Sequence, residues 1–193
     1  MVNRNGTLKK LVLSAMMIAI GTVLSLDIFK FGGLWAFGGG VTFCSMLPLV
    51  IVSYIYGSKW GVFTAFVYSV LQALLGVDNV QYATSFGMAM EILFLDYIVA
   101  YTVIGFAGAF KNIIKNQSLA LVTGIFTTFF ARFACHFVTG WAIWDALWPN
   151  EFGFISPLYS LYYNGSYMLP EAIITSVVAV LLYKAAPKLF KKI

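Results

Sequence analysis

Long apolar runs separated by short polar breaks make up most of this sequence. Six runs are predicted to be transmembrane helices: Thr7 to Leu26, Phe43 to Tyr56, Trp60 to Gly76, Ser85 to Phe110, Ser118 to Trp144 and Tyr163 to Ala185. Crossing a bilayer takes about 20 mostly apolar residues, so the short second and third runs imply tilt or local thinning of the bilayer. The pattern predicts an all-α integral membrane protein, a bundle of six transmembrane helices that forms a single domain over residues 1–193.

The connections between these runs are of two kinds. Residues 56–59 and 111–117 are short polar breaks, whereas Asp27 to Thr42 and Asp145 to Tyr162 are long and contain glycine or proline. Long ordered loops often carry function. The first run follows basic residues as a signal peptide would, but it is long and no small-x-small cleavage site follows it, so we expect it to be retained as a helix.

Composition agrees with a membrane environment. The 193 residues are 61% hydrophobic and only 10% charged, with a mean hydropathy of +0.89. Soluble domains carry about 25% charged residues. So few charges cannot cover the surface of a soluble domain of this length, and lipid must be the solvent for much of it.

The charges are distributed asymmetrically across the predicted membrane. With six helices, ten of the basic residues fall on the side of the two termini: Arg4, Lys9, Lys10, Lys59, Lys111, Lys115, Lys184, Lys188, Lys191 and Lys192. Lys30 lies in an opposite loop and Arg132 within a helix. This bias predicts cytoplasmic N- and C-termini, and the same distribution in loops and termini argues against nucleic acid as a partner.

Five ionisable residues interrupt the apolar runs and need a physical reason. They are Glu91, Asp96, Arg132, His136 and Glu171. A charge in the bilayer is costly, so it normally faces the bundle interior with a partner. We expect one acid, Glu91 or Asp96, to neutralise Arg132, and Asp96 to be the stronger candidate for function.

Polar and aromatic residues are predicted to converge near the outer ends of the helices. Arg132 and His136 are four residues apart and share a helix face, with Trp144 two turns further along it. Asn164 begins the sixth run among several tyrosines. Aromatic faces attract cations and carboxylates pair with amines. The set therefore suits a flat, nitrogen-rich, cationic ligand in a pocket open to the outside.

Several kinds of chemistry have no sequence signal here. The chain contains no GxxxxGK[ST], GxSxG, HExxH or SxxK pattern, so neither ATP hydrolysis by a P-loop nor a known catalytic motif is predicted. Cys44 and Cys135 lie in apolar runs without zinc-ligand spacing, and we expect neither a disulfide nor a metal site. No cofactor is expected.

The chain resembles a known family, the thiamine-specific substrate-binding (S) components of energy-coupling factor (ECF) transporters. The resemblance covers nearly the whole chain. Its segments are residues 15–19 (AMMIA), 38–48 (GGGVTFCSMLP), 95–100 (LDYIVA) with 105–108 (GFAG), 136–140 (HFVTG) with Trp144, and 159–171 (YSLYYNGSYMLPE).

This resemblance implies a non-enzymatic, multi-pass subunit in a bacterial cell membrane that binds thiamine from outside. Position by position, it implies a thiamine site formed by Trp35, Asp96, Tyr97, His136, Trp144, Tyr159 and Asn164. Asp96 would hold the aminopyrimidine, and Trp35 would belong to the first outer loop. It also implies two ATPase subunits and a membrane coupling protein as partners, the latter contacted by Ala15 and Ala19.

Other functions remain open at this point. An S component could instead take another vitamin or precursor, such as hydroxymethylpyrimidine or riboflavin. A second class is an intramembrane enzyme that uses His136 with Asp96. A third is a small proton-coupled secondary transporter that uses Glu91, Asp96 and Arg132 as a relay.

Overall fold

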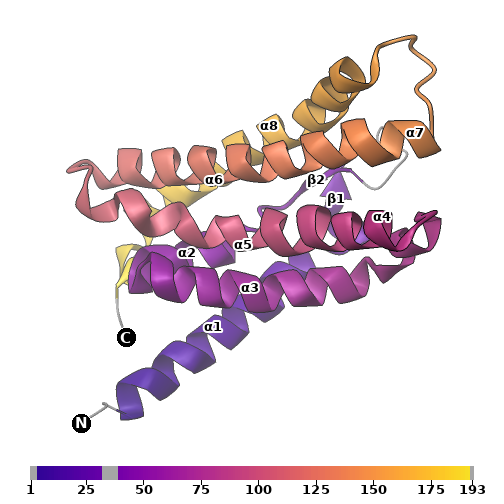
Figure 1. Cartoon of the computed structure of the whole chain (residues 1–193). Coiled ribbons are helices and arrows are strands. Elements are labelled where there is room, and N and C mark those ends of the chain that lie inside the picture. The colour runs from indigo at the N-terminus through magenta and orange to yellow at the C-terminus, as the bar shows by residue number, and fades with distance from the viewer. Residues whose placement is uncertain (1–3, 32–38, 192–193) are drawn as a thin grey trace.

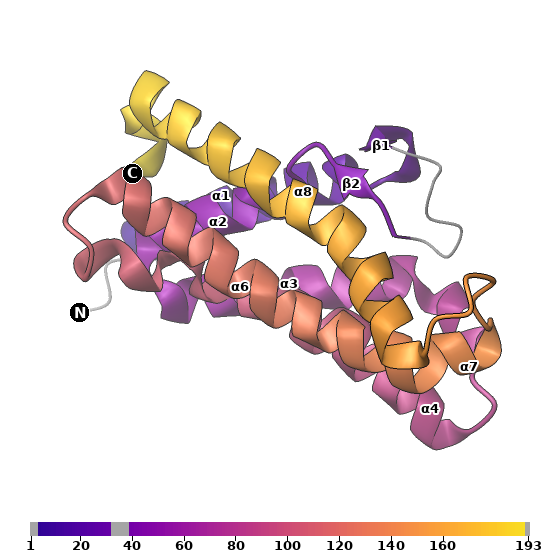
Figure 2. The same ribbon diagram turned by 90° about the horizontal axis from the view of Figure 1, so that it is seen from above.

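The structure is a bundle of long helices with a very short sheet between two of them at one end. The computed structural model describes residues 4–31 and 39–191. The first helix begins and the last helix ends at the same end of the bundle (Figures 1 and 2). The sheet, α4 and α7 lie toward the opposite end, so the chain crosses the length of the bundle repeatedly.

The helices and strands follow in this order. The α-helices are α1 (Arg4–Leu24), α2 (Leu47–Tyr56), α3 (Ser58–Leu75), α4 (Phe86–Glu91), α5 (Ala100–Thr102), α6 (Gln117–Thr139), α7 (Asp145–Leu147) and α8 (Ser156–Ala185), and the strands are β1 (Lys30–Phe31) and β2 (Val41–Thr42). Short 3₁₀ segments cover Asp27–Phe29, Val77–Tyr82, Val103–Asn112 and Pro187–Phe190, and π-helical turns cover Ile92–Val99 and Gly140–Trp144.

Four helical segments of the described chain are long and apolar enough to cross a membrane. They are Asn5–Leu24, Phe86–Asn112, Gln117–Leu147 and Ser156–Ala185, and Leu47–Tyr56 is a shorter apolar helix. The predicted all-helical membrane class is confirmed at this level, since α4 continues through α5 and α6 continues into α7 without a break. The count of six spans and the cytoplasmic termini stay predictions.

Local sequence explains where several helices begin. The side chain of Ser85 caps α4 by accepting from the backbone N–H of Met88 at 3.2 Å. Asn116 caps α6 in the same way, with Oδ1 accepting from Ser118 and Leu119. Such caps satisfy backbone donors that the first turn of a helix leaves free.

Two predicted helix starts were wrong. The second helix starts at Leu47 rather than Phe43, because Cys44 has φ of 57°, a left-handed backbone that no α-helix accommodates. The last helix starts at Ser156 rather than Tyr163. Pro157 stands in its first turn, where a proline needs no N–H partner, so the tyrosines after it lie inside the helix.

The turn from α2 to α3 and the close packing of α3 against the Val103–Asn112 segment depend on glycine. Gly57 turns the chain between α2 and α3 with φ of 86°. At Gly105, an added Cβ would collide with the backbone of Gly61 and Val62 in α3. Gly61 and Gly105 let the backbones of α3 and the Val103–Asn112 segment touch, as small residues do between membrane helices.

Two helices contain π-helical turns beside polar residues. The first, Ile92–Val99, contains Asp96 and Tyr97, which are buried. The second, Gly140–Trp144, ends on Trp144. Single π turns often occur at functional sites, and here they set which side chains face the bundle interior.

The first long connection enters the bundle interior. β1 and β2 pair antiparallel, with Lys30 opposite Thr42 and Phe31 opposite Val41. Val41, Thr42 and Cys44 are buried. Non-helical backbone at membrane depth is tolerated only where protein or water satisfies it, so this connection depends on partners from the helices.

Candidate functional site

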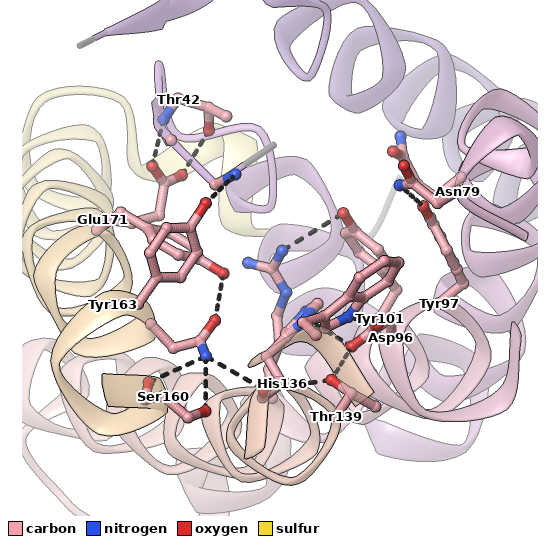
Figure 3. A pocket seen from close by; sticks show the side chains of 18 of the residues that line it. Thr42, Asn79, Asp96, Tyr97, Tyr101, His136, Thr139, Ser160, Tyr163 and Glu171 are labelled. Atoms are coloured by element: carbon pink, nitrogen blue, oxygen red, sulfur yellow. Dashed lines mark hydrogen bonds and ion pairs between the residues drawn. The ribbon is translucent and has the colours of Figure 1, made fainter. Parts of the chain in front are cut away.

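A polar cavity lies among the first connection, the end of α3 and the helices from α4 to α8. Its volume is about 180 Å³. The side chains around it include two buried carboxylates, a guanidinium, an imidazole, an amide and several aromatic rings. Figure 3 shows many of these groups directed toward the same space.

Asp96 is bonded to three other side chains that line this cavity. It is 6% exposed. Its Oδ1 accepts from the Thr139 hydroxyl and lies 3.0 Å from Nδ1 of His136, and its Oδ2 accepts from the Trp144 indole N–H at 2.8 Å. A carboxylate offers about four acceptor positions. One position on Oδ2 therefore remains for another donor.

The imidazole of His136 is oriented by this carboxylate. Since an ionised Asp96 can only accept, Nδ1 carries the proton between the two groups. Nε2 on the other side of the ring is buried and has no hydrogen-bond partner among residues 4–31 and 39–191. In the neutral ring this nitrogen is an acceptor directed away from Asp96.

The expected ion pair of Arg132 with Glu91 or Asp96 is wrong. Asp96 pairs with His136, and Glu91 is exposed on the outside of the bundle. Arg132 is 8% exposed and instead stacks on Tyr101, 4.7 Å from its ring centroid, and donates from Nη2 to the Tyr101 phenol at 3.3 Å. Its Nε has no partner in the described chain. An aromatic ring thus takes the place that the sequence suggested for a carboxylate.

Tyr97 is anchored to the segment after α3. Its phenol accepts from Nδ2 of Asn79 at 2.6 Å and donates to the carbonyl of Gly76 at 3.0 Å (Figure 3). Tyr97 therefore borders the cavity while its hydroxyl is held by the connection from α3 to α4. Tyr159 also borders the cavity and is partly buried in the first turn of α8.

Asn164 joins α8 to α6. Its Nδ2 donates to the carbonyl of His136 at 3.1 Å and to the backbone and side chain of Ser160, and its Oδ1 accepts from the Tyr167 phenol at 2.8 Å. Both ends of the amide are used within the protein. The residue lines the cavity as predicted, but its hydrogen bonds brace the helix pair.

Glu171 is a second buried acid on the opposite wall. Its two oxygens accept from the backbone N–H and the hydroxyl of Thr42, each at 2.5 Å (Figure 3). Among the described residues, no basic side chain lies within ion-pair distance of it. The carboxylate therefore serves the non-helical backbone of the first connection.

The structure brings most of the predicted site residues together. The cavity is lined by Asp96, Tyr97, His136, Trp144, Tyr159 and Asn164. Trp35 lies outside the described residues. Ala15 and Ala19 are exposed on α1, away from the cavity lining.

Sequence reasoning left several cavity residues out of the predicted site. Trp148 stacks on Trp144 with ring centroids 5.6 Å apart, and the Tyr101 ring packs against the guanidinium of Arg132. The four-residue spacing of the two tryptophans was the available signal for Trp148. Arg132 was predicted to share a helix face with His136, and Glu171 was recognised as an ionisable residue in an apolar helix, but neither was among the predicted ligand-binding residues.

Comparison with known proteins identifies the family of this chain. The model of a family described as "Thiamine transporter protein (Thia_YuaJ)" matches residues 11–191. The chain belongs to this thiamine transporter family. Its resemblance to thiamine-specific S components is thereby confirmed.

Individual relatives extend over most of the chain. The thiamine transporter ThiT of Bacillus subtilis (strain 168) is 29% identical over 98% of this chain and 97% of its own length. ThiT of Lacticaseibacillus paracasei is 26% identical over 75% of this chain and 74% of its own. A solved structure of ThiT from Listeria monocytogenes has a TM-score of 0.76 at 24% identity, covering 96% of this chain and 98% of that one, and shares the fold.

Proposed function

We propose that this chain is the thiamine-capturing S component of an ECF-type importer in a bacterial cell membrane. Membership of the thiamine transporter family supports thiamine uptake as its role. The observation that carries the proposed site is the Asp96 carboxylate, held by Thr139, His136 and Trp144 beside an open cavity. The protein acts by binding, without catalysis.

The chemistry of this cavity suits free thiamine. The remaining acceptor position of Asp96 matches the exocyclic amine of the aminopyrimidine. The Trp144 and Trp148 rings offer faces to the thiazolium cation. Nε2 of His136 and Nε of Arg132 are buried without partners in the described chain and are available to polar atoms of the ligand.

Thiamine would enter from outside and leave through the complete importer. The asymmetry of basic residues supports cytoplasmic termini, which directs the half with β2, α4 and α7 outward. Ala15 and Ala19 are exposed on α1 and leave a shallow surface where another helix can approach closely. The coupling protein would dock there and link the subunit to its two ATPases.

Titration of the purified protein with a vitamin panel tests the specificity. Thiamine should quench tryptophan fluorescence at much lower concentration than hydroxymethylpyrimidine or riboflavin, because only thiamine combines an aminopyrimidine with a fixed cation. Binding of riboflavin without thiamine would refute the assignment. Tighter binding of hydroxymethylpyrimidine would make the precursor the substrate.

Uptake measurements test the transport mechanism. Cells that express this chain together with a coupling protein and ATPases should accumulate labelled thiamine, and a catalytically inactive ATPase should abolish accumulation. Uptake by the chain alone that follows the proton gradient would instead identify a secondary transporter.

A further inference from the structure

Glu171 links the middle of α8 to the first connection of the chain. It follows Pro170 inside the helix and is 3% exposed. A buried carboxylate is strongly disfavoured unless hydrogen bonds or a cation compensate. Here Thr42 supplies two hydrogen bonds, through its N–H and its hydroxyl.

The Thr42 hydroxyl also organises the turn that follows it. Its single proton goes to Glu171, because an ionised carboxylate only accepts. Its oxygen is then free to accept from the N–H of Ser45 at 3.0 Å and from the Ser45 hydroxyl, 2.9 Å away. Glu171 therefore fixes the Thr42 hydroxyl oxygen as the acceptor for both donors of Ser45.

This turn contains a backbone conformation that needs support. Cys44 has φ of 57°, which is unfavourable for a side chain with a Cβ. Such a conformation persists where surrounding contacts over-determine it. The bonds from Thr42 to Glu171 and to Ser45 flank Cys44 in the chain and supply that constraint.

The same turn forms one wall of the cavity. Thr42, Ser45, Met46 and Glu171 all line it. Thr42 and Glu171 lie across the cavity from Asp96 (Figure 3). Gly39, a few residues earlier, donates its N–H to the Tyr163 phenol at 3.3 Å. A change in the turn would therefore reshape the cavity without touching the hydrogen bonds of Asp96.

We infer that Glu171 is a positioning residue for ligand binding: through Thr42 it clasps the turn Thr42–Ser45 to α8 and so holds this wall of the cavity closed around the ligand. This inference rests on the proposed function for its ligand. The clasp, defined as the hydrogen bonds between Glu171 and Thr42, controls how long a ligand stays bound. Asp96 controls which ligand binds.

Cys44 provides a local probe of the clasp, because its side chain is 7% exposed and lies within the turn. The parent protein for the test is Cys135→Ser, which leaves Cys44 as its one thiol. The rate at which a small maleimide modifies Cys44 is measured in purified, ligand-free protein. Glu171→Gln and Thr42→Val should each raise this rate by about tenfold or more, the effect expected from losing a charge-assisted hydrogen bond.

Matched variants separate the clasp from general damage. Thr42→Ser keeps the hydroxyl and the N–H, and Glu151→Gln removes an exposed acid, so both should label at the parent rate. Because Glu171→Gln and Thr42→Val both act on the hydrogen bond from the Thr42 hydroxyl to Glu171, the double variant should label no faster than the faster single variant. Unchanged labelling in both single variants, or fully multiplicative rates in the double variant, would overturn the clasp.

Ligand kinetics decide whether the clasp serves binding. Thiamine should dissociate about tenfold faster from Glu171→Gln and Thr42→Val, with an association rate close to that of the parent protein. Faster labelling of Cys44 with an unchanged dissociation rate would reduce Glu171 to a structural residue and contradict the inference. If the parent protein does not bind thiamine, the proposed function fails, and the labelling of ligand-free protein still decides the clasp.

Discussion

Two buried acids face the same cavity from opposite walls and are satisfied in different ways. Asp96 receives hydrogen bonds from Thr139, His136 and Trp144, all on the continuous helix from α6 to α7. Glu171 receives two hydrogen bonds from Thr42, in a non-helical segment. One acid is surrounded by aromatic and imidazole rings, and the other supports a turn.

The difference indicates two roles for a buried carboxylate at a binding site: it can contact the ligand itself, or it can hold the protein segment that shapes the site. The partners of Asp96 leave an acceptor position that a ligand can use. The partners of Glu171 are the parts of the protein that shape the wall. Removing the first acid should change recognition, whereas removing the second should change the shape and persistence of the cavity.

Asp96→Asn should have the largest effect on affinity. Loss of the charge weakens a hydrogen bond to a cationic ligand by ~1.5–3 kcal/mol, so the Kd for thiamine should rise by about 10- to 100-fold. Fluorescence titration measures it. Glu91→Gln, an exposed acid earlier in the same continuous helix, is the matched control and should leave the Kd unchanged. Equal Kd values for Asp96→Asn and Glu91→Gln would remove Asp96 from the site.

Trp144→Ala should have the next largest effect. The substitution removes both the N–H that Asp96 accepts and a ring face on the cavity, and a cation–π contact contributes ~0.5–2 kcal/mol. The Kd should rise by about 3- to 30-fold, as measured by calorimetry because the fluorescent ring is lost. Trp141 is 50% exposed on the same helix, so Trp141→Ala should bind normally. A larger rise in Kd for Trp141→Ala than for Trp144→Ala would show that the wrong ring has been assigned to the cavity.

Thr139→Val tests most directly whether Asp96 and Glu171 have separate roles. The hydroxyl of Thr139 donates to Asp96, and the hydroxyl of Thr42 donates to Glu171. Loss of one hydrogen bond contributes ~0.5–1.5 kcal/mol. Thr139→Val should weaken thiamine binding by about 2- to 10-fold while Cys44 labels at the parent rate. Accelerated Cys44 labelling in this variant would mean that the two walls are not independent.

Ala19→Trp should have the smallest effect on affinity. Ala19 is exposed on α1, outside the lining of the cavity, so the Kd should stay within about twofold of the parent value. The bulky ring should instead block close helix approach, and co-purification with the coupling protein should fall sharply. Ile20→Trp, at a neighbouring position that is already large and exposed, provides the control. Full retention of the complex by Ala19→Trp would move the docking surface elsewhere.

The helices were predictable from hydropathy, and their ends only in part. Apolar runs located all the long helices, because both lipid and the bundle core favour apolar side chains along the whole length of a helix. The sequence between Val41 and Met46 is equally apolar, and it was assigned partly to a helix. Its actual shape follows from a hydrogen bond to Glu171, about 130 residues away, which no local pattern encodes.

The lining of the cavity was predictable where the resemblance supplied motifs and less so where it did not. Asp96, His136 and Trp144 were predicted and line one cavity. The partner of Arg132 was predicted wrongly, because charge balance suggested an acid and the fold supplied the ring and phenol of Tyr101. Such a choice depends on which of several nearby groups packs closest.

Because of the two π-helical turns, the number of residues in a helix, as well as their identity, decides which side chains face the cavity. Each turn holds one residue more than an α-helical turn, and Asp96 and Trp144 lie in these segments. Deleting one residue between Gly140 and Trp144 would restore α-helical register and rotate every later position by about 100°. Trp144 and Trp148 would then rotate together and leave their present positions at the cavity. Relatives that differ by one residue here would present another ring to the cavity, so insertions and deletions can alter ligand preference while every cavity side chain is retained.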